Sequence, residues 1–438
     1  MADIPEIRTK PPCSRQDAAA VLTALREAGH VAYFAGGCVR DTLLGLPAKD
    51  WDVATDAPPQ RVRALFPRTQ AVGAAFGVIL VRQGGSIVEV ATFRAEGIYL
   101  DGRRPSKVHF TTAEEDARRR DFTINGLFLD PLDHDRIIDY VGGLEDLKAR
   151  RLRAIGNPAE RFREDHLRLL RAVRFAARFD MEIEPATDAA ILADAPLLKH
   201  ISPERIADEL RLALTPPTRA TAWQLLLHFR LAVVIFRFLP PPDSAGPVPI
   251  AEDRSIFLAV APGESIPFGL ALAAANLDWQ WRRAAQPPDV RPLLGRQPIQ
   301  QIFRAMRQAL KISNEESDQM RGTLEGIGPL VNDAHPTIAA MKRFLARPTA
   351  PLSRHLMNAL RSRALHSERI DWLRTQLAEL EKTNYAPAPL ITGDDLTAAG
   401  LIPGPKFKSI LETVYDAQLE DRVRTRNEAM ELALKLPH

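Results

Sequence analysis

Two aspartates, Asp50 and Asp52, stand one residue apart in the segment KDWDVAT. Because side chains alternate between the two faces of a strand, this spacing predicts that both carboxylates lie on one face, with Trp51 and Val53 on the other. Two neighbouring carboxylates repel each other unless a cation lies between them, and a hard divalent cation with oxygen ligands suits that place. The pair predicts a Mg²⁺ site; two hydrated charges on an edge strand are the alternative.

Two adjacent glycines, Gly36 and Gly37, precede the aspartates at the predicted junction between a strand and a helix that opens at Val39. At such a junction, backbone N–H groups and the positive end of the helix attract a phosphate, and Arg40 adds a charged donor. A plain tight turn would explain the glycines alone equally well. A phosphate cradle followed by metal-binding carboxylates is a much more specific pattern than either feature by itself.

A third acid, Glu89, lies among apolar residues in the segment GGSIVEVATF. A carboxylate in such a run is costly unless it has a ligand or a partner. Together with Asp50 and Asp52, it would allow two metal ions about 3.5 to 4 Å apart to activate an attacking hydroxyl and stabilise a leaving pyrophosphate. The three acids therefore predict nucleotidyl transfer at a two-metal Mg²⁺ centre.

The elements that must position these residues change in kind along the chain. From Val31 to about Ile138, short β-branched runs alternate with helical patterns, which predicts a small mixed sheet with helices. Beyond Gly143 strand signals nearly vanish and apolar residues recur at helical spacing. The predicted fold class is α+β, an N-terminal head with a mixed β-sheet followed by an elongated all-helical portion. Proline clusters at Pro240–Pro249 and Pro287–Pro292 are predicted loops.

Composition narrows the classes of protein to consider. The 438 residues are 45% hydrophobic and 26% charged, as in a globular protein with room for about three domains. The net charge of +3 permits a nucleic-acid partner without requiring one. Cys13 and Cys38 form no metal-binding motif, which favours a reducing cytoplasm. The start of the chain has no apolar signal, and Leu225–Leu239 reads as a core helix rather than a membrane span.

Four motifs together resemble the bacterial class II tRNA nucleotidyltransferase and poly(A) polymerase family. They are GGxVRD at Gly36–Asp41, the Asp50 and Asp52 pair, RRDFTIN at Arg119–Asn125, and RFREDHLRLLRAVRF at Arg161–Phe175. The resemblance is dense from Val31 to Leu214 and thin beyond. It departs from the family pattern at Gly126, where the family usually has alanine, and we expect this loss of a methyl group to be tolerated.

The resemblance implies a division of the chain into four parts. These are a catalytic nucleotidyltransferase head at residues 15–145, a helical neck for base recognition and RNA binding at 146–215, a helical body at 216–380, and an RNA-binding helical tail at 381–438. In the tail, glycines precede a helix that carries Lys406 and Lys408, which could hold an RNA phosphate. This segment resembles the tail of the tRNA enzymes more than the basic end of poly(A) polymerases.

The activity that the resemblance implies is template-independent addition of CCA to the 3′ end of tRNA. The substrates would be CTP and ATP, pyrophosphate would be released, and the enzyme would be cytoplasmic with no membrane partner. Within the same class, a poly(A) polymerase, an A-adding enzyme and a CC-adding enzyme are alternatives. A catalytically inactive RNA-binding protein is the alternative from a different class, and the presence of Asp50, Asp52 and Glu89 disfavours it.

A ladder of charges in the last motif has a spacing of three residues. Asp165, Arg168, Arg171 and Arg174 are predicted to follow one ridge of a helix, and an exposed, salt-bridged helix is the alternative. The resemblance implies that Asp165 and Arg168 read the base, while Arg171 and Arg174 face the nucleotide phosphates. Because arginine only donates and aspartate only accepts hydrogen bonds, such a pair matches cytosine and adenine and rejects uracil and guanine.

Three other segments have predicted roles. The resemblance implies that Arg120 touches the nucleotide, and that Asp121 or Asn125 either reads the ribose hydroxyl or fixes the strand. The polar stretch from Arg94 to Phe110 resembles the loop that the family uses to switch from C to A addition, and it would equally suit a surface loop. The adjacent His134 and Asp135 resemble part of a metal phosphohydrolase motif, but no second His and Asp set at a plausible spacing accompanies them, so they are predicted to form a turn.

Overall fold

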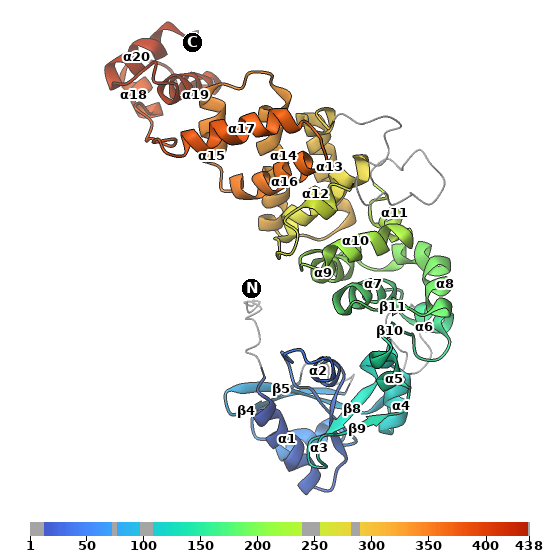
Figure 1. The fold of residues 1–438 in the computed structure, drawn as a ribbon. Helices are drawn as coiled ribbons and strands as arrows, with labels where there is room; N and C mark the ends of the chain where they lie inside the picture. The colour runs from blue at the N-terminus through green and yellow to red at the C-terminus, as the bar shows by residue number, and fades with distance from the viewer. Residues whose placement is uncertain (1–12, 72–76, 97–107, 239–254, 282–289, 437–438) are drawn as a thin grey trace. The chain divides into compact units, whose positions relative to one another are not determined.

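The structure is a computed structural model that describes residues 13–71, 77–96, 108–238, 255–281 and 290–436. The chain divides into two compact units, Met1–Ser202 with Phe229–Val234, and Pro203–His228 with Ile235–His438 (Figure 1). The first contains the sheet, and the second is helical, so the α+β class is confirmed. The predicted proline loop at Pro240–Pro249 and most of the polar stretch between Arg94 and Phe110 lie outside the described residues.

A seven-stranded mixed sheet forms the core of the first unit, with the strand order β3-β4-β5-β2-β1-β8-β9. Its strands are β1 (Ala32–Ala35), β2 (Val53–Thr55), β3 (Thr69–Ala71), β4 (Val78–Gln83), β5 (Ser86–Thr92), β8 (Leu127–Asp130) and β9 (Arg136–Asp139). The pair β2 and β5 is parallel, while the other neighbours are antiparallel. The parallel pair is possible because α3 (Pro59–Leu65) and the strands β3 and β4 lie between β2 and β5 in the chain.

The hairpin of β4 and β5 shows why its residues form strands. Along β5, buried and half-buried side chains alternate without exception, which is the pattern of a strand with one face on the core. The connecting turn contains Gly84 with φ of 56°, a conformation that favours glycine. A Cβ on Gly84 would also lie 2.2 Å from a carboxylate oxygen of Asp17, so the turn fits closely against helix α1 (Arg15–Glu27).

Helices and two further strands complete the head. Helix α1 begins after Ser14, whose hydroxyl accepts a hydrogen bond from the Asp17 N–H, and its buried face packs on the sheet. Helix α2 (Gly37–Leu43) follows β1 directly. The remaining elements are α4 (Ala113–Arg118), α5 (Gly143–Lys148), the 3-10 turn η2 (Thr123–Asn125), and the hairpin of β6 (Arg94–Glu96) and β7 (Val108–Phe110).

The rest of the first unit is helical apart from one small exception. Its helices are α6 (Pro158–Glu164), α7 (Arg168–Phe179) and α8 (Pro185–Asp194). Two short parallel strands, β10 (Arg151–Leu152) and β11 (Glu182–Ile183), pair beyond Gly143, where sequence patterns give almost no strand signal. Two-residue strands are too short for periodicity to reveal them.

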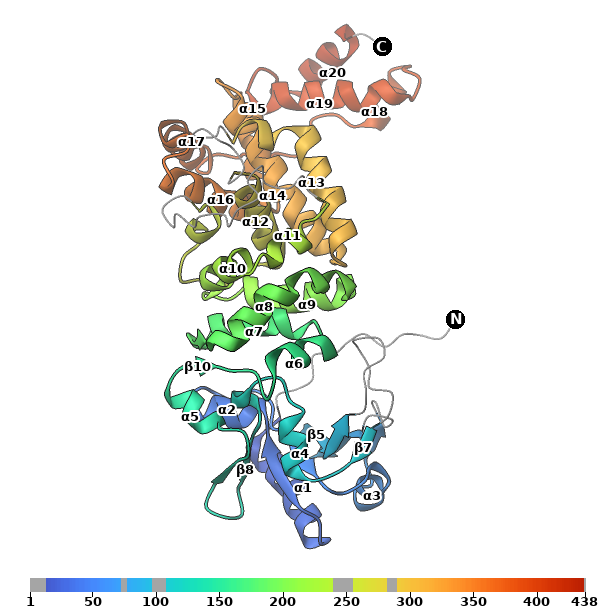
Figure 2. The same ribbon diagram turned by 90° about the vertical axis from the view of Figure 1, so that its right-hand side faces the viewer.

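The second unit is built from helices throughout the residues that the structure describes. They are α9 (Pro203–Leu214), α10 (Arg219–His228), α12 (Phe268–Trp281), α13 (Arg296–Ala309), α14 (Asn314–Asn332), α15 (Ile338–Leu345), α16 (Ala350–Ser362), α17 (Ser367–Leu380), α18 (Gly393–Ala398), α19 (Pro405–Leu419) and α20 (Arg426–Lys435). Helix α14 packs beside α12, α13 and α16 (Figure 2). A Cβ on Gly269 of α12 would lie 2.7 Å from the Glu316 carbonyl oxygen of α14, so glycine allows this close approach.

The prediction of one core helix over Leu225–Leu239 is wrong. Helix α10 ends at His228, and α11 (Leu231–Ile235) begins after Arg230, which has φ of 56°. A left-handed residue cannot continue a right-handed helix. Among the described residues, no helix combines the length and the apolar character that crossing a membrane requires.

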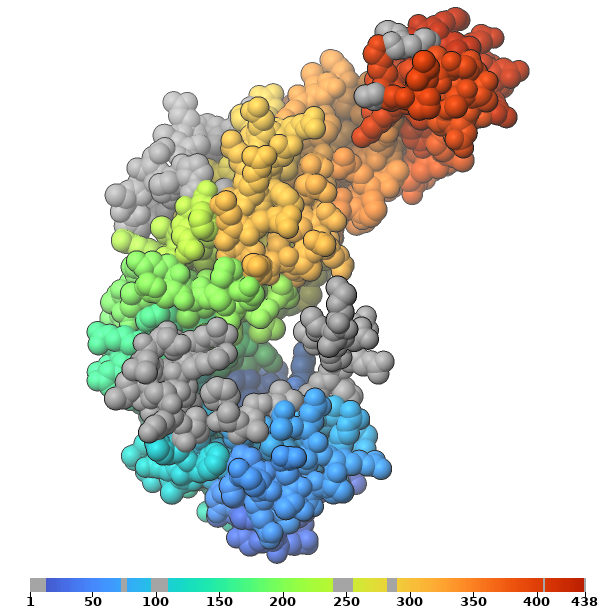
Figure 3. Space-filling model, turned by 180° about the vertical axis from the view of Figure 1, so that it is seen from behind, coloured from blue at the N-terminus to red at the C-terminus, as the bar shows by residue number. Residues whose placement is uncertain are grey.

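The helices α18, α19 and α20 form a small lobe, which is coloured red in Figure 3. This lobe has its own hydrophobic core. The core consists of the buried residues Ile391, Leu396, Ile410, Val414, Ala417, Val423, Ala429 and Ala433. Buried contacts join this lobe to α15, where the Lys342 ammonium donates to the Leu419 carbonyl at 2.7 Å. The four-part division into head, neck, body and tail stays a prediction.

Candidate active site

The two spaced aspartates lie at the entrance of β2. Trp51 and Val53 are buried, Asp50 is exposed and Asp52 is half-buried, so the predicted alternation holds from Asp50 to Val53, whereas Ala54 and Thr55 after it are both buried. The regular strand begins only at Val53, one residue after Asp52. The Ala35 N–H donates to the Asp52 carbonyl at 3.1 Å, and Trp51 packs edge-on against Phe34. This packing fixes the backbone that presents both carboxylates outward.

The parallel register of β2 and β5 brings the third acid to the same place. Val53 pairs with Val90, so continuing the register by one residue sets Asp52 beside Glu89 on one face of the sheet. Glu89 is half-buried. In the described part of the chain, no group of three or more His, Cys, Asp or Glu side chains is arranged to hold a metal ion. The structure thus aligns Asp52 with Glu89 without forming a closed metal cluster.

The glycine pair forms the turn between β1 and α2, and the two glycines differ. Gly36 has φ of 72°, and a Cβ there would lie 2.9 Å from Nη1 of Arg120. Gly37 would accept a Cβ, whose nearest neighbour would be the Arg40 guanidinium at 3.6 Å. Arg120 also donates from Nη1 to the Asn125 carbonyl at 3.1 Å. The structure therefore brings Arg120, a predicted nucleotide contact, directly against the Gly36 turn.

Arg40 is more deeply buried than we expect for a side chain that donates to a phosphate at the start of a helix. Its side chain is buried, donates to the carboxylate of Asp41 at 2.6 and 2.8 Å, and donates to the side-chain oxygen of Asn125. Its guanidinium also lies 4.5 Å from the ring centre of Phe179. Burial lowers the pKa of Arg40 below its ordinary value, although the charge of Asp41 opposes this shift. A role of Arg40 in phosphate binding stays a prediction.

Asp121 and Asn125 are joined to each other and to a distant helix. The Asn125 amide and the Phe122 N–H both donate to one oxygen of Asp121, and Arg171 of α7 donates to the other at 2.7 Å. Burial would raise the pKa of the Asp121 carboxyl, but Arg171 and these hydrogen bonds outweigh burial and lower the pKa to about 2. Asp121 is therefore a carboxylate in the structure, and it anchors the RRDFTIN segment to α7.

The prediction that Asp165, Arg168, Arg171 and Arg174 follow one helical ridge is wrong at its first member. Asp165 caps the end of α6 in an extended conformation, while α7 begins only at Arg168. An Asp165 carboxylate oxygen accepts from the Leu167 N–H at 3.1 Å, which stabilises the turn between the two helices. Asp165 and Arg168 consequently stand on either side of a break.

The three arginines of α7 have different surroundings. Arg168 is buried and donates from Nη1 to the carboxylate of Glu164 and to the Arg161 carbonyl. Arg171 is paired with Asp121, whereas the guanidinium of Arg174 lies over the Phe175 ring at 4.3 Å. The structure thus unites Arg168 and Arg171 with the RRDFTIN segment.

Sequence reasoning missed two buried aspartates next to these residues. Asp41 pairs with Arg40 and, at 3.3 Å, with Arg178 of α7. Asp116 pairs with Arg119 and Arg120. The second could have been found, because an acid three and four residues before two arginines is a typical helical pairing pattern. The pair of Asp41 with Arg178 of α7 could not have been found in this way, because the two residues are far apart in the sequence.

Two smaller predictions can be compared directly with the structure. His134 and Asp135 lie in a turn with φ of 49° and 56°, so the turn is confirmed. A Cβ on Gly126 would lie 2.7 Å from Cγ2 of Val141. An alanine methyl group at this position would press against Val141, and the tolerance of glycine stays a prediction.

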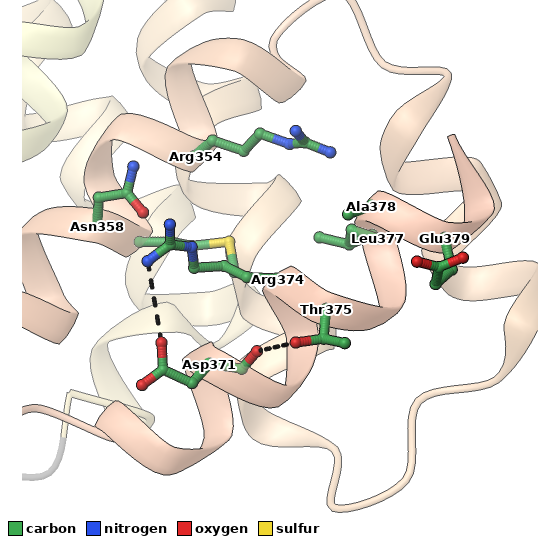
Figure 4. Close-up of a pocket in the computed structure, with 9 residues that line it drawn as sticks. Arg354, Asn358, Asp371, Arg374, Thr375, Leu377, Ala378 and Glu379 are labelled. Atoms are coloured by element: carbon green, nitrogen blue, oxygen red, sulfur yellow. Dashed lines mark hydrogen bonds and ion pairs between the residues drawn. The ribbon is translucent and has the colours of Figure 1, made fainter. Parts of the chain in front are cut away.

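One cavity in the helical unit is unrelated to the predicted chemistry. It has a volume of about 650 Å³ and lies between α16 and α17, lined by Arg354, Met357, Asn358, Asp371, Arg374, Thr375, Leu377, Ala378 and Glu379. Figure 4 shows the Arg374 guanidinium turned toward Asp371, 3.9 Å away. Its arginines are balanced by carboxylates, so it has no excess positive charge with which to attract a triphosphate.

Two family models match this chain. They describe a poly A polymerase head domain over residues 32–153 and a probable RNA and SrmB-binding site of polymerase A over residues 180–241. The first match contains the Gly36 turn, the predicted catalytic acids and the RRDFTIN segment.

Curated proteins similar to this chain include CCA-adding enzymes of Streptococcus pyogenes serotypes M2 and M5, each 45% identical over 230 residues. The match covers 52% of this chain and 56% of each relative, so the chain spans about half the length of the curated relatives it matches. A solved Bacillus stearothermophilus CCA-adding enzyme in complex with CTP is 29% identical, with a TM-score of 0.69 over 95% of this chain and 96% of its own. A Thermotoga maritima CCA-adding enzyme complexed with tRNA is 20% identical, with a TM-score of 0.63 over 95% and 93% of the two chains, and shares the fold.

Proposed function

We propose that this chain belongs to the family of bacterial tRNA nucleotidyltransferases and poly(A) polymerases, as its similarities suggest, and that it adds CCA to the 3′ end of tRNA. CTP and ATP would be the substrates and pyrophosphate the second product. The observation that carries the proposal is the parallel register in which Val53 pairs with Val90, because Asp52 and Glu89 are the residues just before this pair and Asp50 lies two residues earlier. Such a row of acids next to a phosphate-binding turn suits transfer of a nucleotidyl group.

The acids suit magnesium better than a metal ion whose ligands are all supplied by protein side chains. Asp50 is exposed and Asp52 half-buried, so water can reach both carboxylates. Mg²⁺ keeps several water ligands and binds through one or two carboxylates together with substrate phosphates. Asp50 and Asp52 would hold the ion, which when bound would polarise the reacting phosphoryl group. The charge of Glu89 beside Asp52 favours a second cation at the same edge of the sheet.

The arginines near the turn supply the charges for the triphosphate. Arg120 lies against Gly36, and Arg171 and Arg174 follow one face of α7. Arginine forms forked hydrogen bonds that match phosphate oxygens. Arg40, Asp121 and Asn125 hold these groups in place through their mutual hydrogen bonds. In this proposal, Asp121 and Asn125 serve first to fix the backbone of the RRDFTIN segment.

Base selection would fall to Asp165 and Arg168. Arg168 is held by Glu164 and by the carbonyls of Arg161 and Arg119, so its guanidinium has little freedom to adapt to a wrong base. A donor-only arginine beside an acceptor-only aspartate selects cytosine and adenine. The break between α6 and α7 places both residues at the junction of the two helices, where we assign base reading.

The C-terminal lobe offers a contact for RNA. A cavity of about 650 Å³ there is lined mainly by apolar residues, together with Arg343, Phe407, Lys408, Glu412 and Tyr415. The Arg343 guanidinium stacks on the Tyr415 ring at 5.1 Å and pairs with Asp416, and the exposed Lys408 lies 3.9 Å from Glu412. Aromatic and cationic side chains at one edge suit an RNA backbone and an unstacked base. We assign RNA binding to this lobe and to the neck, in an enzyme that works in the cytoplasm.

The test uses tRNA transcripts that end before CCA, after C and after CC, each incubated with one nucleotide at a time in Mg²⁺ or in EDTA. Ordered addition of C, C and A, followed by arrest, supports the proposal. Addition of A alone to the CC transcript identifies an A-adding enzyme, and addition of C alone a CC-adding one. Long A tails on unstructured RNA establish a poly(A) polymerase. RNA binding without any addition establishes an inactive RNA-binding protein.

A further inference from the structure

Asp116 is a buried carboxylate at the centre of the head, and none of the predicted roles uses it. Its exposed fraction is 2%. One oxygen accepts from the Arg94 N–H at 3.2 Å and from two nitrogens of Arg119 at 2.7 and 2.9 Å. The other accepts from two nitrogens of Arg120 at 2.9 and 3.2 Å. The Asp116 side chain thus binds the guanidinium groups of Arg119 and Arg120 and the backbone N–H at the start of β6.

The hydrogen bonds determine where the Arg120 guanidinium points. Nε and Nη2 are directed to Asp116 and Nη1 to the Asn125 carbonyl, and these three bonds use three of the five N–H groups of an arginine. The planar fork therefore has one orientation, in which Nη1 lies against the Gly36 turn. N–H groups are left over for a phosphate oxygen.

Arg119 extends the influence of Asp116 to the neck. With its side chain held by Asp116, the Arg119 carbonyl accepts from Nη1 of Arg161 at 3.1 Å and from Nη2 of Arg168 at 3.4 Å. Arg168 is the proposed reader of the base. Asp116 therefore acts on both ends of a bound nucleotide, through Arg120 at the phosphates and through Arg119 at the base.

The electrostatics keep this carboxylate charged. Burial would raise the pKa of the Asp116 carboxyl, but Arg120 and Arg119 outweigh burial and leave the pKa below its ordinary value. Because a buried charge is tolerated only with partners in good geometry, Asp116 and its two arginines hold one another in place.

We infer that Asp116 is a positioning residue for nucleotide binding, which fixes the Arg120 fork at the Gly36 turn and, through Arg119, the base-reading Arg168. The inference rests on the proposed function for the identity of the ligand, CTP or ATP. The inference does not depend on which RNA is the substrate. A measurement of nucleotide binding can therefore test it separately from nucleotide addition.

The experiment compares Asp116→Asn with Asp130→Asn in the full-length protein. Asp130 is also buried, with an exposed fraction of 1%, and pairs with Arg26 at 3.3 Å rather than with an arginine of the RRDFTIN segment. Both variants remove one buried charge from the head. We expect Asp116→Asn to weaken ATP and CTP binding, measured by calorimetry in Mg²⁺, by about tenfold or more, and to lower discrimination against UTP and GTP. Asp130→Asn should change neither nucleotide binding nor discrimination. The two variants should have similar melting temperatures.

The outcomes separate the inference from the proposed function. If wild-type protein adds nucleotides and Asp116→Asn binds and selects them as wild type does, the inference is wrong. If wild-type protein adds no nucleotide but binds ATP in a way that Asp116→Asn weakens, the proposed function fails and the inference holds. Should Asp116→Asn not fold, Arg119→Lys makes the same test from the partner side, since it keeps the charge and breaks the fork. Unchanged binding and selectivity in Arg119→Lys would likewise overturn the inference.

Discussion

Asp121 and Arg171 form a 2.6 Å ion pair between residues fifty positions apart in the sequence. The pair joins the RRDFTIN segment of the head to helix α7, and the ring of Phe122 packs edge-on against Phe175 of α7 at 5.8 Å beside it. A polar bond and an aromatic contact at one junction fix both the distance and the rotation of α7 relative to the segment. The α7 arginines, which are predicted to bind the nucleotide, therefore depend on Asp121 for their position.

This ion pair predicts a pH dependence of stability. The pKa of Asp121 falls from its ordinary value of 3.8 to about 2, which corresponds to about 2 kcal/mol at neutral pH. Because the folded-state pKa is the lower one, this stability is present above pH 4 and is lost as the pH falls toward 2. Asp121→Asn should lower the melting temperature at pH 7, and its difference from wild type should shrink below about pH 4. A difference that stays constant over that range would contradict the assignment.

The predicted metal ligands can be tested by their removal. Asp50→Ala and Asp52→Ala should each reduce nucleotide addition by about 100- to 1,000-fold or more, because the reacting phosphoryl group loses charge stabilisation. Trp51 stays packed on Phe34, so tryptophan fluorescence and the melting temperature should change little. Asp56→Ala is the control, since Asp56 is an exposed acid just past the same strand. Turnover near the wild-type rate in either test variant would remove that residue from the metal site.

The Gly36 turn can be tested with a matched glycine. Gly36 and Gly45 have φ of 72° and 70°, so alanine should cost about 1 to 2 kcal/mol of stability at either position. Only at Gly36 would the new Cβ press against Arg120, because nothing lies within 4 Å of a Cβ on Gly45. Gly36→Ala should therefore raise the KM for CTP and ATP, whereas Gly45→Ala should lower stability alone. Equal KM values in the two variants would show that the turn does not position Arg120.

Base selection should depend on Arg168 more than on its neighbours. Arg168→Ala should reduce discrimination of CTP and ATP against UTP and GTP by about 10- to 100-fold, the effect of losing a hydrogen bond from a charged donor. Arg163→Ala serves as the control, because Arg163 is exposed on α6 in the same motif. The measurement is kcat/KM for each of the four nucleotides on a tRNA that ends before CCA. Selection as sharp as in wild type would mean that another group reads the base.

RNA binding by the C-terminal lobe should be separable from nucleotide binding. Replacing Lys406 and Lys408 together by glutamate places negative charge on α19 beside the lobe cavity. The Kd for tRNA should rise and its salt dependence should weaken, while the KM for CTP at saturating tRNA stays the same. Lys435→Glu, in α20 of the same lobe, is the control. An unchanged Kd for tRNA would assign RNA binding to the neck and body alone.

Local sequence patterns were sufficient for several parts of the site. The alternation of exposed and buried side chains holds from Asp50 to Val53, just before and at the start of β2, although all three residues of β2 itself are buried. The turn at His134 and the mainly helical second half follow in the same way from short-range backbone preferences. The pattern failed at Asp165, because the spacing of charges does not reveal a break that the Asp165 side chain itself stabilises.

The sequence by itself determined which residue types are available for the chemistry: the spaced acids, the glycine turn and the arginines with their helical spacing. Only the tertiary structure decided their partners. It buried Arg40 beneath Phe179, paired Asp121 with Arg171, and set Asp52 beside Glu89 through a parallel register. The reason is physical: periodicity follows from backbone geometry over a few residues, whereas partners far apart in the chain meet only when burial of apolar surface packs their elements together.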